Sequence, residues 1–345
     1  MATPHTIHRP PLPFTEHELA QARRFNTWLA RLPRFRIRNR ITPRLIQALL
    51  RLGQVGGSAT LVKHGLRAET SVVGAGGVRV PVPVRIIRPK GQAKGVVLDI
   101  HGGGWVVGNA QMNDALNIAM VEQCSVAVVS VDYRLAVGTP IEGLMDDCLS
   151  AARWLLNPGN REFAELPVIV VGESAGGHLA AATLLRLKAW PTLLQRISGA
   201  VLYYGVYDLT GTASVRAAGP ETLVLDGPGM VDAFRLLTPG SGEHERQQPP
   251  LSPLYGDFTG FPPVLMVAGE LDPLRDDTFG LAERWRHCAP VELQVLPAAP
   301  HGFIHFPTAM AARVLAHGHA WISKRIGDTD NDGAASEAKV NPATE

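Results

Sequence analysis

Short runs of branched apolar residues alternate with longer stretches that carry an apolar residue every three to four positions, from about residue 70 to residue 325. The short runs are typical of buried strands, and the longer stretches have the spacing of helices. Because the two kinds alternate, the pattern predicts an α/β fold with a mostly parallel sheet and helices on both faces. The expected strands are 71–74, 78–87, 95–100, 126–131, 167–171, 198–204, 263–268 and 291–296. The expected helices are 113–122, 141–156, 176–187, 230–237, 278–286 and 308–324.

Residues from about 14 to 65, in front of this alternating part, show a helical spacing of apolar residues that Pro33 and Pro43 divide. We expect residues 1–69 to form a helical segment of their own, followed by one α/β domain at 70–326. The first two expected strands of that domain are too close together for a crossover, so they should form an antiparallel hairpin at one edge of the sheet. The tail at 327–345 is polar and is predicted to be disordered.

Composition narrows the class of protein. The chain has 345 residues, 46% of them hydrophobic, which suits a globular protein with a sizeable core. The net charge of +2 gives no reason to expect nucleic acid as a partner. The three scattered cysteines predict neither a disulfide framework nor a metal motif, and buried free thiols in a reducing compartment are expected. The start of the chain lacks the apolar core of a signal peptide, so we expect a cytoplasmic protein with no integral membrane segment.

Residues 172–176 have the sequence Gly-Glu-Ser-Ala-Gly and lie between the strand expected at 167–171 and the helix expected at 176–187. This motif at a strand-to-helix junction is typical of a nucleophile elbow, a tight turn that exposes the serine hydroxyl. Glycines on both sides let the turn close without a clash of Cβ atoms. The pattern predicts Ser174 as the nucleophile of a hydrolase, and the N–H group after it, on Ala175, as an oxyanion donor.

A serine nucleophile needs a base and an acid that orients the base, and in this type of enzyme the acid precedes the histidine along the chain. Asp272 follows the strand expected at 263–268, at the edge where open α/β sheets build their sites. We therefore expect Asp272 to be the acid. Glu270, Asp276 and Asp277 are its rivals, although the last two fall where they would stabilise the start of the next helix.

The candidate base is His301, in a loop after the strand expected at 291–296. Gly302 beside it leaves the imidazole room to reach Ser174. Three nearby histidines lack the spacing and the acidic partners of a metal site, so we expect no metal and no cofactor. These are His305, His317 and His319.

A glycine-rich loop completes the candidate chemistry. Residues 101–105 have the sequence His-Gly-Gly-Gly-Trp and follow the strand expected at 95–100. Three consecutive glycines leave backbone N–H groups open to a substrate oxygen. Loss of one such oxyanion donor typically costs roughly 3–4 kcal/mol of transition-state stabilisation. Trp105 has two open interpretations, as a wall of the acyl pocket or as packing beneath the N-terminal helices.

Five motifs together resemble the pattern of the hormone-sensitive lipase-like carboxylesterases. They are residues 101–105, Asp-Tyr-Arg-Leu-Ala at 132–136, the elbow at 172–176, Asp-Pro-Leu-Arg-Asp at 272–276 and His-Gly-Phe at 301–303. The resemblance covers about residues 70–325. It implies an α/β-hydrolase fold, a cap formed by the N-terminal helices, and esters of short to medium acyl chains as substrates.

The same resemblance implies a role for each matching residue. The implied catalytic triad is Ser174, Asp272 and His301. The implied oxyanion donors are the N–H groups of Gly103, Gly104 and Ala175. The implied substrate contacts are Trp105 and Phe303.

Three departures from the family pattern bear on specificity. Val137 and Gly138 stand where the family usually has Pro-Glu, and this loop is expected to shape a wall of the site. Glu173 stands where many relatives have aspartate, and we expect it to hydrogen-bond nearby loop backbone or to tune the site. Residues 205–250 match the family poorly and are expected to form a variable insert that decides the acyl group.

The N-terminal segment is rich in arginine and has no acidic residue between Glu18 and Glu69. Arginines interleaved with apolar residues also occur in segments that bind anionic membranes or nucleic acid. We expect instead that the apolar stripe packs on the core while the arginines face water or pair with acids, and contact with a lipid surface is the alternative. Further along the chain, Arg134 is expected to form a buried pair with an acid such as Asp146 or Asp147, and contact with substrate is the alternative.

These features predict a serine carboxylesterase that acts on a small-molecule ester through an acyl-enzyme intermediate. An amide, formamide or lactone hydrolase with the same machinery is an alternative, and a non-catalytic receptor on the same fold is another. The natural substrate, its stereochemistry and the oligomeric state are not indicated by the sequence, and a homodimer stays open.

Overall fold

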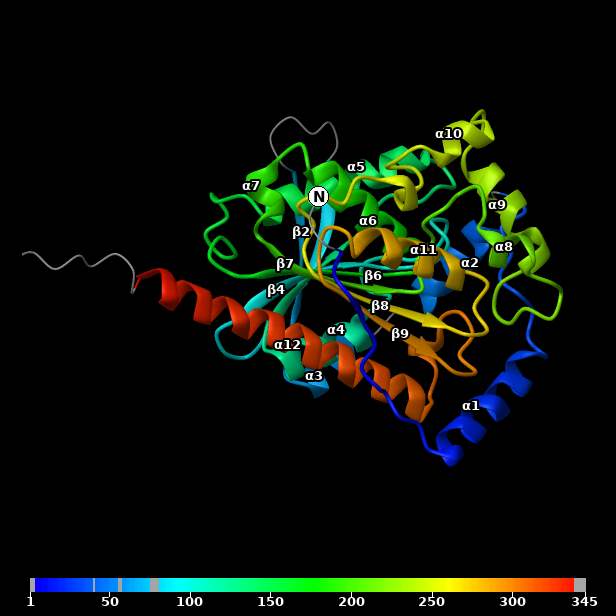
Figure 1. The fold of residues 1–345 in the computed structure, drawn as a ribbon, viewed down its shortest axis with the longest axis horizontal. Helices are drawn as coiled ribbons and strands as arrows, with labels where there is room; N and C mark the ends of the chain where they lie inside the picture. The colour runs from blue at the N-terminus through cyan, green and yellow to red at the C-terminus, as the bar shows by residue number, and fades with distance from the viewer. Residues whose placement is uncertain (1–3, 40, 55–57, 75–80, 338–345) are drawn as a thin grey trace, which may run out of the picture.

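The computed structural model describes residues 4–39, 41–54, 58–74 and 81–337 (Figure 1). Within these residues a nine-stranded sheet runs through the molecule in the order β1-β9-β8-β7-β6-β4-β5-β3-β2. All neighbouring pairs are parallel except β2 with β3 and β3 with β5. The strands are β1 Ile7–His8, β2 Ala68–Val73, β3 Val82–Ile87, β4 Gly95–Ile100, β5 Val126–Val131, β6 Val168–Glu173, β7 Ile197–Tyr203, β8 Val264–Gly269 and β9 Val291–Leu296.

The expected strands and their arrangement are confirmed. Six of them, β4 to β9, lie within two residues of the predicted bounds, and the predicted hairpin is the antiparallel pair β2–β3 at the sheet edge. The first residues of the second predicted strand, 78–80, lie outside the described residues. Strand β1 was not predicted, because a strand of two residues has no periodicity to detect. It pairs in parallel with β9, where Ile7 lies opposite Val291.

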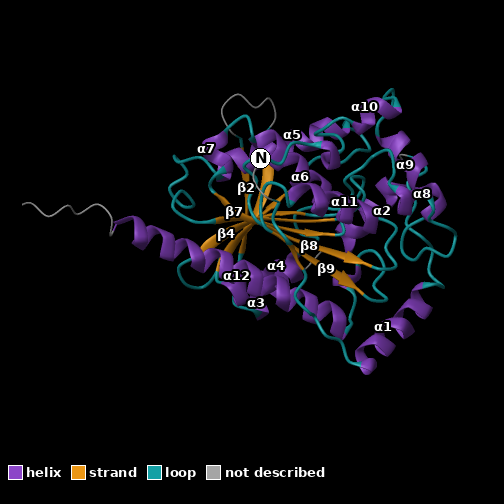
Figure 2. Cartoon of the chain, viewed as in Figure 1, coloured by secondary structure: helices purple, strands orange, loops and turns teal. Residues whose placement is uncertain are grey.

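Helices cover both faces of the sheet (Figure 2). On one face the strands pack against α5, α6 and α11, and on the other against α4 and α12. The helices are α1 Glu16–Leu29, α2 Thr42–Gly53, α3 Ser58–Lys63, α4 Asp114–Cys124, α5 Ile141–Leu155, α6 Ala175–Leu187, α7 Pro191–Leu194, α8 Ala213–Arg216, α9 Met230–Leu237, α10 Glu243–Gln247, α11 Arg275–Trp285 and α12 Ala309–Glu337. Short 3-10 turns are η1 Gly227–Gly229, η2 Pro253–Tyr255 and η3 Phe303–His305.

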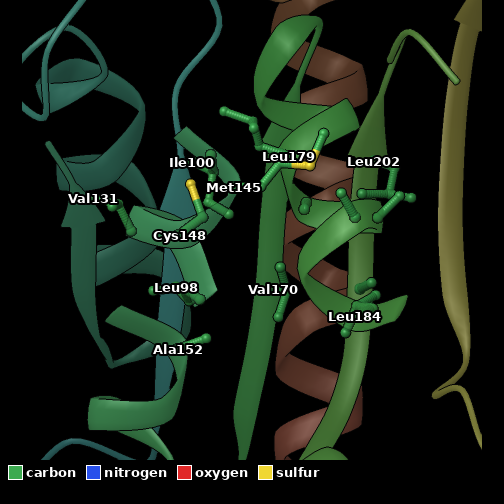
Figure 3. Packing of buried hydrophobic residues seen from close by; sticks show 14 of the residues in the cluster. Leu98, Ile100, Val131, Met145, Cys148, Ala152, Val170, Leu179, Leu184 and Leu202 are labelled. Carbon is green, nitrogen blue, oxygen red and sulfur yellow. The ribbon is translucent and has the colours of Figure 1, made fainter. Parts of the chain in front are cut away.

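The central strands are buried on both faces, which explains their continuous apolar sequences. Figure 3 shows one side of this core, where Leu98 of β4 and Val170 of β6 face Cys148 of α5 and Leu179 of α6. Cys124 and Cys148 are buried free thiols, as expected, whereas Cys288 is half-buried. The described helices include none that is long and apolar enough to cross a membrane.

The N-terminal segment folds as helices, as its apolar spacing predicts. Helix α1 begins at a capping box, in which the Thr15 hydroxyl accepts from the Glu18 N–H at 3.2 Å and Glu18 accepts from the Thr15 N–H at 2.8 Å. The helix is tied to α12 by an ion pair of Glu18 with Arg313. At the other end of the chain, α12 extends to Glu337, past the predicted domain boundary at residue 326, so the boundaries of cap, domain and tail stay predictions.

The apolar stripe expected to pack on the core lies at residues 25–41, and it packs there in part. Leu29 is buried, and Phe35 and Ile37 pack against the core, whereas Ile41 is exposed.

Helix α2, which follows, turns three leucines away from the core. Its buried residues are Pro43 and Gln47, whereas Leu45, Leu49 and Leu52 are exposed. The reason is local. Hydrogen bonds of Gln47 hold the opposite side of the helix against the domain.

Candidate active site

Ser174 occupies the tight turn between β6 and α6. Its φ of 52° and ψ of −121° are unusual for a residue with a side chain, as the elbow motif predicts. Two glycines make the turn sterically feasible. A Cβ atom on Gly176 would lie 1.9 Å from the Ile100 carbonyl oxygen, and one on Gly172 would lie 2.5 Å from the Gly176 carbonyl oxygen. The elbow therefore packs directly against the end of β4.

The structure brings Ser174, His301 and Asp272 together from three separate loops. The Ser174 Oγ lies 2.8 Å from the His301 Nε2, and the His301 Nδ1 lies 2.9 Å from the Asp272 Oδ2. The other Asp272 oxygen accepts from the Leu274 N–H at 2.9 Å. Both His301 and Asp272 are buried. This arrangement can remove a proton from the serine and hold the resulting imidazolium.

The rival acids have other partners. Asp277 accepts from the Tyr207 N–H at 2.6 Å and the Asp208 N–H at 2.9 Å, so it anchors the start of the 205–250 insert. Its complete burial raises the pKa of its carboxyl to about 7. Asp276 accepts from the Ser214 N–H at 2.9 Å, and Glu270 is exposed.

The glycine loop lies beside the elbow with an unusual backbone. The φ angles of Gly103 and Gly104 are +99° and +58°, and a Cβ atom on Gly103 would lie 2.1 Å from the Val107 carbonyl oxygen. Only glycine fits such a position. Within the described residues, the N–H groups of Gly103, Gly104 and Ala175 donate to no protein acceptor. They are therefore free to bind a ligand oxygen.

Trp105, for which the sequence left open a pocket wall or packing beneath the N-terminal helices, has its ring contacts with His178 and Phe234. It is buried, and its side chain lines the cavity beside Ser174. The Trp105 Nε1 also donates to the His178 Nδ1 at 3.1 Å, and the His178 Nε2 donates to the Leu251 carbonyl at 2.9 Å. Burial lowers the pKa of His178 to about 4, so this ring is neutral and serves as a fixed bridge between the loops. His178 was not predicted as a site residue, because in the sequence it appears only as one residue of an apolar helix.

Glu173, next to Ser174, joins three parts of the candidate site. One carboxylate oxygen accepts from the Gly102 N–H at 3.4 Å, which confirms the expected bond to nearby loop backbone. The other accepts from the Tyr204 hydroxyl at 3.0 Å and contacts the His305 Nε2 at 2.6 Å. Burial pushes the pKa of Glu173 upward, but hydrogen bonding and charge attraction from His305 hold it below the ordinary value. Burial likewise opposes the charge on His305, but Glu173 raises its pKa overall.

A cavity of about 60 Å³ opens next to Ser174. Its wall combines the predicted site with the cap and the insert, through Phe35, Ile37, Leu225 and Phe234 among others. Phe303 does not line this cavity. It is buried against Tyr204, with ring centroids 5.5 Å apart, so the structure gives it packing contacts where the sequence predicts a substrate contact.

The N-terminal segment reaches the site through a strap, residues 33–38, that runs along residues 224–226. The Phe35 N–H donates to the Val224 carbonyl at 2.6 Å, and the Asp226 N–H donates to the Phe35 carbonyl at 3.1 Å. Arg36 and Arg38 both reach the Asp226 carboxylate, at 3.3 and 3.6 Å. The strap thereby forms part of the wall of the cavity that Ser174 also lines.

Other predictions about side chains can be compared with the structure directly. Arg134 is paired with Asp147, its Nη2 lying 2.7 Å from the Asp147 Oδ1, which confirms one of the two expected partners. Asp146 pairs with Arg186 instead. In the described part of the chain, no group of three or more histidines, cysteines or acids is placed to hold a metal ion.

Comparison with known proteins shows which families and proteins this chain resembles in sequence. A model of the alpha/beta hydrolase fold family matches residues 97–305. The carboxylesterase NlhH of Mycobacterium tuberculosis is 33% identical over 268 residues, which cover 73% of this chain and 80% of that protein. An arylesterase of Saccharolobus solfataricus is 32% identical over 206 residues, 59% of this chain and 66% of the relative.

Solved structures show the same similarity in three dimensions. The structure of a bacterial heroin esterase superposes with a TM-score of 0.77 at 25% identity, covering 91% of this chain and 99% of that one. The esterase LipW of Mycobacterium marinum gives a TM-score of 0.73 at 27% identity, covering 82% and 90%.

Proposed function

Since this chain belongs to the α/β-hydrolase fold family, among the carboxylesterases that resemble hormone-sensitive lipase, we propose that it hydrolyses carboxylic esters through a covalent acyl-serine intermediate. One observation carries the proposal. Ser174 Oγ lies 2.8 Å from His301 Nε2, whose other nitrogen lies 2.9 Å from Asp272. These are hydrogen-bond distances for a nucleophile, its base and the acid that orients the base.

In the first half of the reaction, Ser174 Oγ attacks the ester carbonyl carbon while His301 Nε2 takes the hydroxyl proton. Asp272 holds the Nδ1–H tautomer and stabilises the imidazolium. The tetrahedral intermediate then expels the alcohol, to which His301 returns the proton. The products of this half-reaction are the free alcohol and an acyl ester on Ser174.

In the second half, His301 removes a proton from a water molecule that attacks the acyl-serine carbonyl. The new tetrahedral intermediate collapses to the carboxylic acid and free Ser174, with the proton returned to the serine oxygen. In both halves the negative oxygen would be bound by the N–H groups of Gly103, Gly104 and Ala175. Their lack of protein acceptors supports this role, and Ala175 begins α6, whose positive end favours an anion.

The shape of the site supports esters with a short to medium acyl chain. The cavity of about 60 Å³ is lined mainly by apolar groups, with Trp105 on one side and Phe234 of the insert on another. Phe35 of the strap closes it further, since its ring lies where a side chain on Gly104 would be. We therefore assign the choice of acyl group to the cap and the insert, and the reaction to the elbow.

The proposal is tested with a series of p-nitrophenyl esters of rising acyl length, assayed on the wild type and on Ser174→Ala. We expect Ser174→Ala to lose roughly 10⁴-fold or more in kcat, because the covalent step has no other nucleophile. Ser71→Ala, on the edge strand β2, is the matched control and should keep wild-type activity.

Two further measurements decide between the alternatives. A fluorophosphonate probe should label the wild type and not Ser174→Ala, as detected by intact mass. Folded wild type that stays unlabelled and hydrolyses no ester would favour a receptor, and faster turnover of a matched amide or lactone would favour those substrates.

A further inference from the structure

Helix α2 turns its apolar side chains toward solvent. Leu45, Leu49 and Leu52 have exposed fractions of 63%, 68% and 68%. Because they are spaced by four and three positions, they lie on one face of the helix. Ile41, just before the helix, is 67% exposed and extends the patch. We call these four residues the α2 apolar face.

Polar contacts on the opposite side fix this orientation. The Gln47 side chain is buried, donating to the Gly108 carbonyl at 2.9 Å and accepting from the Gly108 N–H at 2.8 Å. After the helix, Gln54 and Asn109 exchange two amide hydrogen bonds, at 3.0 and 2.7 Å. Turning the leucines inward would break all four bonds. The outward apolar face is therefore built into the way the helix is attached to the domain.

The charge around α2 indicates what could cover this face. Eleven lysines and arginines and no acidic residue lie between Glu18 and Glu69, whereas the remaining chain has 22 basic and 31 acidic residues. Arg44 and Arg51, both exposed, are within the helix itself. Two copies packed through this face would bring their cationic segments together. An anionic surface is complementary to the segment, and like-charge repulsion acts against a second copy.

We propose that α2 is a docking helix for an anionic lipid surface. Its leucines enter the boundary between headgroups and acyl chains, and Arg44 and Arg51 contact lipid phosphates. An amphipathic helix gains binding free energy from these two contributions, burial of apolar side chains and attraction to anionic headgroups. This function is additional to ester hydrolysis and does not depend on it.

The α2 apolar face lies near the candidate site. The helix lies at the end of the sheet toward which the parallel strands point (Figure 2). A groove of about 590 Å³ beside it is lined by Ile46 of α2 and by Arg34 of the strap. Phe35, Arg36 and Arg38 line both this groove and the cavity that contains Ser174. Docking through α2 would thus bring the strap, and the cavity behind it, close to the lipid surface.

The test is flotation of the full chain with two kinds of vesicle, phosphatidylcholine alone and phosphatidylcholine mixed with phosphatidylglycerol. We expect binding to the mixed vesicles to be at least about tenfold tighter, and to fall as salt is added. The variant Leu45→Ser/Leu49→Ser/Leu52→Ser should lower the affinity by about tenfold or more. Val72→Ser is the matched control, because Val72 is 67% exposed but lies on the edge strand β2, and its binding should be unchanged.

Thermal unfolding of every variant shows whether it is folded. If the triple variant is not, Leu49→Ser alone and the salt dependence of the wild type give the answer. Wild type that binds neither vesicle, or a folded triple variant that binds as tightly as wild type, would overturn the proposal. So would wild-type self-association in sedimentation that the leucine substitutions abolish, because a second copy would then cover the face.

Discussion

At the scale of single residues, Glu173 connects the turn that holds Ser174 to the loops around it. Its two oxygens contact the Gly102 N–H, the Tyr204 hydroxyl and His305. Gly102 begins the glycine loop, and the Tyr204 ring lies 4.9 Å from that of His301. The carboxylate is thus in contact with the neighbours of both the proposed oxyanion donors and the proposed base, so its role is to position them.

We expect Glu173→Gln to lower kcat by roughly tenfold while changing KM little, because the substitution loosens the loop without removing a reacting group. Glu173→Asp should recover part of the loss. An unchanged kcat in a folded Glu173→Gln variant would contradict the positioning role. Steady-state kinetics on a p-nitrophenyl ester measure both parameters.

The contact between Glu173 and His305 predicts that the folding stability depends on pH. Because the pKa of Glu173 is lowered, the contribution of its carboxylate to folding stability is fully present above pH 4.5, the ordinary pKa of this group. That contribution is lost as the pH falls through the lowered pKa. Because the pKa of His305 is raised, the contribution of its imidazolium to folding stability is fully present below pH 6.5, the ordinary pKa of this group. That contribution is lost as the pH rises through the raised pKa. The stability difference between wild type and His305→Gln should therefore be largest between these two values and should shrink at alkaline pH. Denaturant unfolding across the pH range measures it, and a flat difference would contradict the pairing.

Gly176 is a second residue on which the site depends. A Cβ atom there would lie 1.9 Å from a backbone oxygen, which no side-chain movement can relieve. We expect Gly176→Ala to lower the free energy of unfolding by about 1–3 kcal/mol or more and to reduce activity. Gly138→Ala, where nothing lies within 4 Å of the added atom, should stay within about 0.5 kcal/mol of wild type. Equal stabilities would show that the elbow tolerates more backbone movement than its packing indicates.

Sequence reasoning reached Ser174, Asp272 and His301 because each follows a strand whose apolar run is easily identified. It did not reach His178 or the Glu173–His305 pair. Their partners, Trp105, Leu251 and Tyr204, come from distant parts of the chain, so no local pattern connects them. The predicted substrate contact of Phe303 rested on a motif alone, and packing against Tyr204 decided its position.

At the scale of elements, the apolar runs predicted the central strands well because these strands are buried on both faces. The orientation of α2 was beyond the same reasoning. Periodicity identifies an apolar face and assumes that it is buried, whereas here the amide of Gln47 decides which side faces the domain. The contact between the strap and the insert could not be predicted from the sequence either. It is a single isolated β-bridge between Phe35 and Leu225, which leaves no periodic pattern.

The position of Phe35 at this contact predicts how the N-terminal segment affects specificity for the acyl chain. Removing the Phe35 ring should enlarge the cavity over Gly104, so Phe35→Ala should raise kcat/KM for long acyl esters relative to short ones by about tenfold. The control is Trp28→Ala, which removes a half-exposed ring from α1. The p-nitrophenyl ester series measures the profile, and identical profiles for Phe35→Ala and wild type would place the acyl group elsewhere.

At the scale of the whole molecule, the first and the last strand along the described chain pair at one edge of the sheet. Strand β1 pairs with β9, and just before it the His5 N–H donates to the Arg286 carbonyl at 2.8 Å. Just after it, the Pro10 carbonyl accepts from the Gln294 side chain at 3.0 Å. These contacts cover the edge of β9, which would otherwise present unpaired backbone groups to other chains.

Removing residues 1–12 should therefore lower the melting temperature and promote aggregation, whereas removing residues 1–4 leaves β1 in place and should do neither. Differential scanning calorimetry and size-exclusion chromatography make the comparison. If the two truncated chains behave alike, β1 contributes nothing to protecting the edge.

The pairing of β1 with β9 also sets an order of events during synthesis. Ile7 is made long before its partner Val291, and His301 comes ten residues after Val291. In a chain under synthesis, β1 therefore has no partner until β9 has been made. Contact between Ser174 and His301 likewise waits for residues that follow β9, so the sheet edge and the proposed site are completed by the same late stretch of the described residues.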